Sequence, residues 1–297
     1  MSELSSPFRP APMPFVVLLD EPVRYVRGHF RAIFPAVAVP VAVLSTVAAV
    51  AQAVDIRSSV ASGSTPAAFW SPGVLLIALV LAFVALFAYV AGQMAALDVL
   101  AGRPVDMKRA WRFALRPRVW GTLLLVIFAM IGSFFACFLP LFYVAPLLAF
   151  TLPVMVEENA FGFPALVRSA ALARYNPGGR WFESPIVKVL LLMLVGTLIT
   201  YLAGLLVALP FQLPMFVDFW RDALSGKEDL QGTMARWIWL QVPAQFLSAL
   251  VRTAIYLYTA FGMGLLFNDV RGRKEGVDLR SEIDLLFPAL PAGAPLP

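Results

Sequence analysis

Six apolar runs constrain this chain more than any other feature of its sequence. A helix of roughly 20 residues crosses a hydrocarbon core of about 30 Å. The runs cover residues 33–54, 74–97, 120–139, 141–156, 186–208 and 242–267. Only 14% of the residues are charged, against about 25% in soluble domains. The sequence therefore predicts an all-α, polytopic integral membrane protein with six transmembrane helices.

The segments that flank this membrane domain differ from it in composition. Residues 1–14 are rich in Ser and Pro, and residues 280–297 contain many prolines. We therefore expect a disordered lead over 1–14, a membrane domain over 15–279 and a C-terminal tail over 280–297. The lead has no basic segment followed by a short apolar stretch and a small-residue cleavage site, so no signal peptide is predicted.

The distribution of Lys and Arg predicts the orientation. Eighteen of the 23 basic residues lie before the first run, in the second and fourth connections or after the sixth run. Four lie in the other connections. Cytoplasmic loops carry the excess of basic residues. Both termini are therefore expected in the cytoplasm.

The second connection encodes a basic amphipathic helix. Its apolar residues recur at helical spacing: Met107, Ala110, Trp111, Ala114 and Leu115. The other face carries Lys108, Arg109, Arg112 and Arg116, and Asp106 is a suitable N-cap. Such helices lie on membrane surfaces, where their cations attract anionic headgroups. We call this helix the basic elbow and expect it to bind anionic lipid at the inner surface.

Two similar segments suggest a repeat. Gly162-Phe-Pro164 matches Gly102-Arg-Pro104 and precedes the apolar positions Phe163, Leu166, Val167 and Ala170. Before the first run, Val23, Val26, Phe30 and Ile33 alternate with Arg24, Arg27 and Arg31. The chain thus has three candidate units, each an elbow followed by a helical hairpin. The alternative is that basic amphipathic linkers are common to multispan proteins.

A polar stripe follows one face of the sixth run. It consists of Gln241, Gln245, Ser248, Arg252, Tyr256 and Thr259. An ionisable residue inside the membrane is a functional-site candidate. The stripe is either a seam that joins this helix to its neighbours or one wall of a hydrated path.

Simple geometry predicts the surroundings of the stripe. Arg252 lies 16 residues before Asn268, about 24 Å along a helix, which places it near the outer surface. A predicted outer helix over 215–223 carries Asp218 and Asp222, and either is a candidate partner. Thr197, Tyr201 and Gly204 on the fifth run are expected to face the stripe.

Residues suited to catalysis are few. The single histidine is His29 and the single cysteine is Cys137. No spacing indicates a metal site, a nucleotide loop or an activated nucleophile. Glu157 and Glu158 point about 100° apart on a helix, which favours a helix end facing the following basic segment. We expect no enzyme activity, cofactor, metal or nucleic-acid partner.

Two stretches carry a family resemblance. Residues 267–279 combine Phe267, Asp269, Arg271, Arg273, Lys274, Glu275, Gly276, Asp278 and Leu279, and residues 154–172 contain Glu157, Arg168 and Ser169. These stretches resemble the membrane domain that is fused to some glycerophosphoryl diester phosphodiesterases and that also forms stand-alone six-pass bacterial proteins. The resemblance implies a six-helix architecture and a bacterial inner membrane. In that family the phosphodiesterase activity belongs to a separate domain, so we do not expect it of this membrane domain.

Two functions follow as hypotheses. The first is a scaffold or regulator that docks cytoplasmic or membrane protein partners and anionic lipids through its basic elbows and charged tail. The alternative is a transporter or lipid-handling protein that uses the polar stripe.

Overall fold

A computed structural model describes residues 13–62, 72–136, 139–176, 180–225 and 230–276. These residues are helical apart from short connections, and they include no strand. The predicted lead and tail fall almost entirely outside the described residues. The elements are α1 (Phe15–Ala61), α2 (Pro72–Leu100), α3 (Met107–Ala114), α4 (Pro117–Phe135), α5 (Leu139–Leu148), α6 (Thr151–Glu157), α7 (Phe163–Ala173), η2 (Trp181–Glu183), α8 (Pro185–Leu224), α9 (Leu230–Trp237), η3 (Ile238–Leu240) and α10 (Gln241–Glu275).

Within the described part of the chain, six helical segments are long and apolar enough to cross a membrane. They are Phe15–Ala61, Pro72–Leu100, Pro117–Phe135, Pro140–Glu157, Pro185–Leu224 and Ala235–Glu275. Each contains or largely overlaps one of the six apolar runs, so the all-helical prediction with six candidate spans is confirmed.

Two helices are longer than expected. The elbow predicted before the first span is not a separate helix, because α1 is continuous for 47 residues from Phe15. The outer helix predicted over 215–223 forms the last turns of the 40-residue α8. In both places the helical periodicity continues in phase, and no glycine in a left-handed conformation ends the helix.

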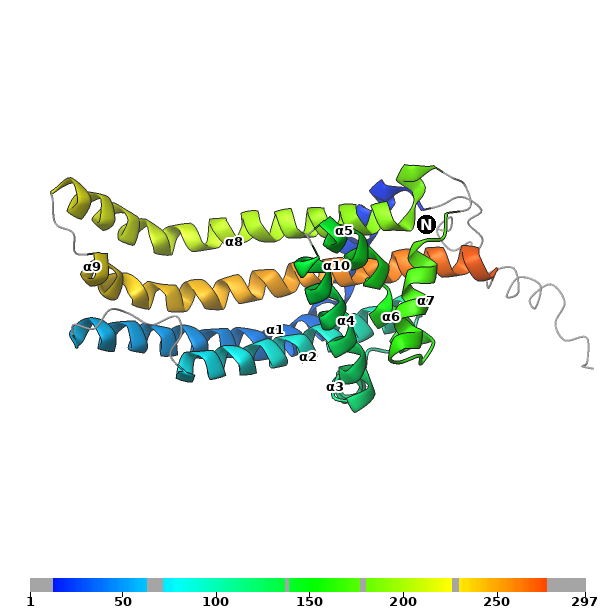
Figure 1. Cartoon of the computed structure of the whole chain (residues 1–297), viewed down its shortest axis with the longest axis horizontal. Helices are drawn as coiled ribbons and strands as arrows, with labels where there is room; N and C mark the ends of the chain where they lie inside the picture. Colours follow the sequence, from blue (N-terminus) through cyan, green and yellow to red (C-terminus); the bar gives the residue numbers. More distant parts are fainter. Residues whose placement is uncertain (1–12, 63–71, 137–138, 177–179, 226–229, 277–297) are drawn as a thin grey trace, which may run out of the picture. The chain divides into compact units, whose positions relative to one another are not determined.

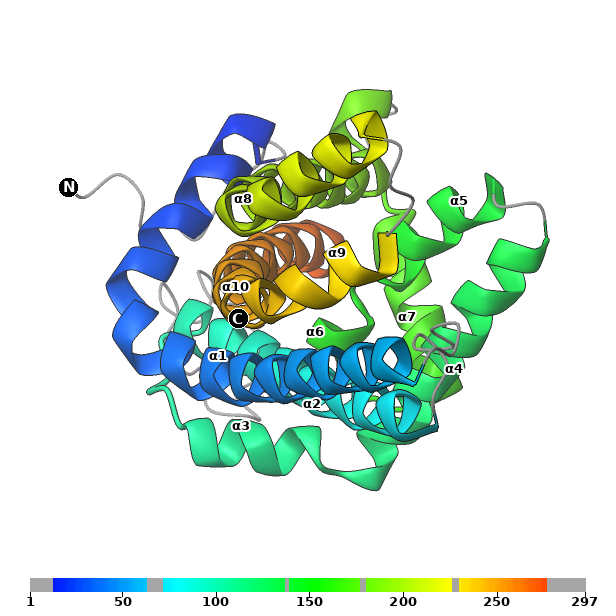
Figure 2. The ribbon, with the colours of Figure 1, turned by 90° about the vertical axis from the view of Figure 1, so that its left-hand side faces the viewer.

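The chain divides into two compact units, and α1, α8 and α10 contribute to both. One unit contains 1–25, 117–193 and 261–297, and the other contains 26–116 and 194–260. We call the first the hairpin unit, because it holds α4 to α7, and the second the bundle unit. In the bundle unit, the long segments of α1, α2, α8 and α10 run side by side (Figure 1 and Figure 2).

Small residues allow the helices of the bundle unit to approach closely. A Cβ atom built on Gly92 of α2 would lie 3.3 Å from side-chain atoms of both Tyr256 and Leu257 on α10, and 3.4 Å from Val37 on α1. A Cβ on Gly196 of α8 would lie 2.6 Å from Cγ2 of Thr259. Association in lipid depends on such packing, because the bilayer supplies little hydrophobic driving force between helices. α10 therefore packs against both α2 and α8.

The fourth span of the hairpin unit is broken at its prolines. Pro146 lies inside α5, which ends at Leu148, and α6 starts at Thr151. Pro153 is the third residue of α6, where its missing N–H needs no helical partner. The fourth span is therefore interrupted between two short helices.

A neighbouring helix binds a carbonyl group beside this interruption. The Ser169 hydroxyl on α7 donates to the Leu147 carbonyl oxygen at 2.6 Å. Ser169 is fully buried, and a carbonyl freed near a proline at membrane depth needs such a partner. Ser169, predicted to be a signature residue, therefore holds α7 against the broken span.

The contact between Gly196 and Thr259 generates a stability prediction. Substituting Gly196→Ala should lower the thermal unfolding temperature in detergent micelles, because overpacking costs about 1–3 kcal/mol and exceeds the helix-propensity gain of about 1 kcal/mol. Gly204→Ala is the matched control on the same helix, since a Cβ there meets nothing within 4 Å. Adding Thr259→Ser to Gly196→Ala should restore stability. Equal behaviour of the two alanine variants would contradict this packing.

Candidate functional site

The two stretches singled out in the sequence meet in the hairpin unit. Arg168 on α7 donates from Nε to Oε2 of Glu158 at 2.9 Å and from Nη2 to Oε1 at 3.3 Å. Its guanidinium also pairs with Glu275 on α10. Arg271 completes the group, with Nε 3.3 Å from Oε2 of Glu275 and 3.7 Å from Oε1 of Glu158. Two arginines thus alternate with two glutamates, and we call these four residues the charge ring.

The charge ring contains the neighbour of one residue named in the family resemblance. The resemblance pointed to Glu157, but its neighbour Glu158 supplies the carboxylate that binds Arg168 and Arg271. The expectation that this helix end faces the following basic segment agrees with the structure. Adjacent helical residues point in different directions, and Glu158 is the glutamate whose ion pairs join the end of α6 to α7 and α10.

A second ion pair, between Asp269 and Arg273, is more buried than the charge ring. Oδ2 of Asp269 accepts from Nη2 of Arg273 at 2.7 Å, as the spacing of four residues predicts. The Asp269 side chain is only 4% exposed, and its Oδ1 accepts from the Met13 backbone N–H at 3.4 Å. The Met13 carbonyl oxygen accepts from Nζ of Lys188 at 2.8 Å. Asp269 therefore connects the end of α10 to the start of the described chain.

The other contacts made by residues 267–276, at the end of α10, are also structural. Phe267 is fully buried and packs against Phe150, with ring centroids 6.1 Å apart. Tyr175 donates to the Arg273 carbonyl oxygen at 3.1 Å, and Lys274 donates to that of Ala171 at 2.9 Å. Gly276 ends α10 with φ of 59°. Asp278 and Leu279 lie outside the described residues.

The side chains of α3 have a different arrangement. Asp106 caps the helix by accepting from the Lys108 and Arg109 backbone N–H groups at 2.9 and 3.2 Å, as predicted. Ala110, Phe113 and Ala114 are buried. The four cations of the basic elbow are exposed, and within the described part of the chain none forms an ion pair: Lys108, Arg109, Arg112 and Arg116. Phe113, absent from the predicted apolar face, carries the burial in place of the exposed Leu115.

The two Gly-x-Pro segments adopt similar dihedrals in different roles. Gly102 and Gly162 have φ of 68° and 69°. Gly102 follows α2, where Arg103 N–H binds the Asp98 carbonyl oxygen at 2.8 Å and ends the helix. Gly162 is itself the N-cap of α7. The elbows therefore begin at different distances from their glycines, and the repeat remains a prediction.

The polar stripe splits into packed and exposed residues. Tyr256 donates from its hydroxyl to the Tyr89 carbonyl oxygen, and its ring lies 4.3 Å from that of Tyr89. Thr259 donates to the Tyr256 carbonyl oxygen at 2.8 Å, and Ser248 is buried. Gln245 and Arg252 are exposed. The C-terminal end of the stripe, at Tyr256 and Thr259, thus packs against neighbouring helices.

The prediction that Asp218 or Asp222 pairs with Arg252 is wrong. Asp218 binds Trp237 Nε1 at 2.8 Å and Arg236 at 3.3 Å, and Asp222 accepts from Thr233 at 2.7 Å, so neither pairs with Arg252. Both carboxylates instead fasten α9 to the end of α8.

The facing residues on α8 were also misplaced. Gly196 contacts the stripe, whereas Thr197 is exposed and Tyr201 is 67% exposed. Adjacent positions on a helix point about 100° apart. The prediction selected polar side chains, whereas the contact occurs at a small residue one position away.

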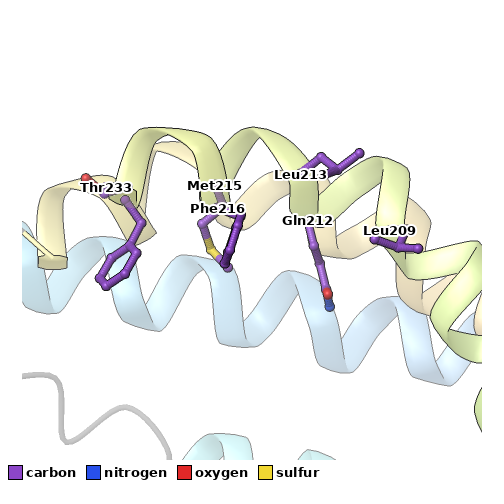
Figure 3. Close-up of a pocket in the computed structure, with 7 residues that line it drawn as sticks. Leu209, Gln212, Leu213, Met215, Phe216 and Thr233 are labelled. Carbon is purple, nitrogen blue, oxygen red and sulfur yellow. The ribbon is translucent and has the colours of Figure 1, made fainter. Parts of the chain in front are cut away.

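Two features were not found from the sequence. The Asp98 side chain is 1% exposed and binds Nε of Arg103 at 2.6 Å. A hollow of about 400 Å³ lies beside the last turns of α8 (Figure 3). Its lining is mostly apolar and consists of Leu209, Gln212, Leu213, Met215, Phe216, Phe219 and Thr233. Among the described residues, no three His, Cys, Asp or Glu side chains gather to hold a metal ion.

The difference in burial between the two ion-pair sites gives a graded prediction. Asp269→Asn should lower the free energy of unfolding by about 2 kcal/mol, because it leaves Arg273, which is 13% exposed, without its carboxylate. Glu275→Gln in the half-exposed charge ring should cost less than about 1 kcal/mol. Denaturation by dodecyl sulfate in mixed micelles measures both values. Equal losses would show that Asp269 is not the stronger link.

No known protein family, curated protein or solved structure matches this chain in the comparisons made. The resemblance to the phosphodiesterase-linked membrane domain accordingly stays an expectation from the two quoted stretches.

Proposed function

We propose that this protein is a non-enzymatic membrane scaffold or regulator whose basic elbow binds anionic lipid and docks cytoplasmic partners. The observation that supports this proposal is the contrast between the basic elbow and the charged end of α10. The charged end of α10 places its side chains in contacts within the chain. The basic elbow instead keeps four cations exposed beside the buried apolar residues of α3. A helix fixed in this way presents its charges without first having to fold.

The supporting electrostatics are of useful size. Each basic residue near an anionic surface contributes about 1 kcal/mol, and the attraction decreases within a Debye length. The Arg116 guanidinium also lies 5.5 Å from the centre of the Phe113 ring, which holds it beside the helix. Four such charges on the basic elbow give a preference for anionic lipid that salt should weaken. In this proposal the charge ring and the Asp269–Arg273 pair hold the hairpin unit together.

The proposal includes the orientation inferred from charge, with α3 and both termini in the cytoplasm of a bacterium. The bacterial inner membrane is the address that the family resemblance implies. The six candidate spans are consistent with a multi-pass membrane protein, and the basic residues supply the argument for sidedness.

Lipid retention tests the role of α3. Native mass spectrometry of the full chain released from nanodiscs with mixed lipids should show anionic lipid bound. Substituting Gln for Lys108, Arg109, Arg112 and Arg116 should reduce its retention at least about tenfold. The matched control substitutes Gln for four exposed arginines elsewhere, Arg57, Arg174, Arg180 and Arg221. Equal loss in both variants would mean that net charge, and not α3, attracts the lipid.

The lipid-handling alternative has support in the hollow on α8. Its volume of about 400 Å³ lies within the range of ligand pockets. The same spectra separate the two functions. An apolar molecule that survives neutralisation of α3 but disappears in a Met215→Trp variant would favour the alternative.

Cysteine labelling tests the orientation. In a Cys137→Ser background, a membrane-impermeant maleimide should label Leu224→Cys at the exposed end of α8 in intact cells. Leu115→Cys, beside the exposed cations of α3, should react only after permeabilisation. The reverse pattern would place the basic elbow outside and contradict cytoplasmic docking.

A further inference from the structure

Neighbouring helices of the bundle unit give the depth of Arg252. A Cβ built on Gly92 of α2 would lie next to the side chains of Val37 on α1 and Leu257 on α10. These three residues therefore lie at about the same height along the bundle. Arg31 precedes Val37 by six residues and Asp98 follows Gly92 by six, which places both charges about 9 Å from this level at 1.5 Å per residue. Since α1 and α2 run in opposite directions, the two charges lie on the same side.

Arg252 lies on the other side of this level. It precedes Leu257 by five residues, so it is about 16 Å from the level of Arg31 and Asp98. The same count along α1 places it about 20 Å from Asp55, the next charged residue toward the other end. In a hydrocarbon core of about 30 Å, Arg252 is therefore near the middle. This count gives a position nearer the middle than the sequence estimate, which counted from Asn268 and not from the charges on neighbouring helices.

This position leaves the guanidinium without a counter-charge. Arg252 is exposed, and among the described residues no carboxylate pairs with it. An arginine at the helix centre costs at least about 2.5 kcal/mol, and such residues pair with a partner or line a cavity. The headgroup levels are about 15 Å away on either side, too far for one side chain to reach without deforming the bilayer.

The chain has no acidic residue at that depth to offer. No Asp or Glu occurs in residues 32–54, 72–97, 119–156, 189–217 or 237–268. A second copy of this chain would therefore also lack a carboxylate near mid-depth. The counter-charge must come from a different molecule.

We infer that the exposed face of α10 around Arg252 and Gln245 is a docking surface for a transmembrane helix of another protein that carries Asp or Glu near mid-depth. A membrane-spanning partner places a carboxylate at any depth, whereas a lipid phosphate stays at the interface unless the bilayer deforms. Gln245 lies two turns from Arg252 on the same face and adds an amide for interhelical hydrogen bonds. This surface is independent of the role proposed for α3.

A guest peptide of known composition tests the inference. The full-length protein is reconstituted in phosphatidylcholine vesicles with a labelled transmembrane peptide of Leu and Ala that has one Glu at its centre. Energy transfer should show that this guest binds at least about threefold more tightly than the same peptide with Gln. Arg252→Leu should abolish the difference, and Arg252→Glu should prefer a guest with Lys. Neutralising the four cations of α3 should leave binding unchanged.

A relocated charge tests the register. Arg252→Leu combined with Gln245→Arg keeps the net charge and moves the cation seven residues, about 10 Å along the same face of α10; Gln245 is exposed. The preferred guest should then carry its Glu displaced by a similar distance. Equal binding of the Glu and Gln guests to the unsubstituted protein would overturn the inference, as would a preference that survives Arg252→Leu. A phospholipid bound through Arg252 that the guest cannot displace would also overturn it.

Discussion

Backbone hydrogen bonding in lipid is the constraint on which this structure depends. An unpaired N–H or C=O group costs several kcal/mol where water is absent, so spanning segments must be helices. Continuous helices meet most of this requirement along α1, α2, α4, α8 and α10, although Pro210 and Pro214 inside α8 each lack an N–H. Where Pro146 interrupts the fourth span, a side chain from α7 binds a neighbouring carbonyl group. The helices then associate through small residues such as Gly92 and Gly196.

Local signals in the sequence predicted much of this fold. Hydropathy identified all six candidate spans, and Asp106 marked the start of α3 because an N-cap acts on its nearest backbone groups. The Asp269–Arg273 pair followed from helical spacing alone. Each of these features is decided within one helix or one turn, and this locality made them predictable.

Features that join different helices were mostly not predictable. A choice between Glu158 and Glu157 depends on the direction in which α6 ends, and the contact at Gly196 depends on the rotation of α8 about its axis. Asp218 looked available to Arg252 until α9 supplied Trp237 and Arg236. The depth of Arg252 likewise needed the neighbours of Gly92. Amphipathic periodicity alone does not fix these rotations and levels.

The hydrogen bond between Ser169 and Leu147 also has a consequence for biogenesis. The broken span is emitted by the ribosome before α7, so at first the Leu147 carbonyl has no hydroxyl to bind. Ser169 is added 22 residues later, so this carbonyl cannot reach its final partner while the fourth span is being made. The contact that closes the break in the fourth span therefore forms only after translation has passed α7.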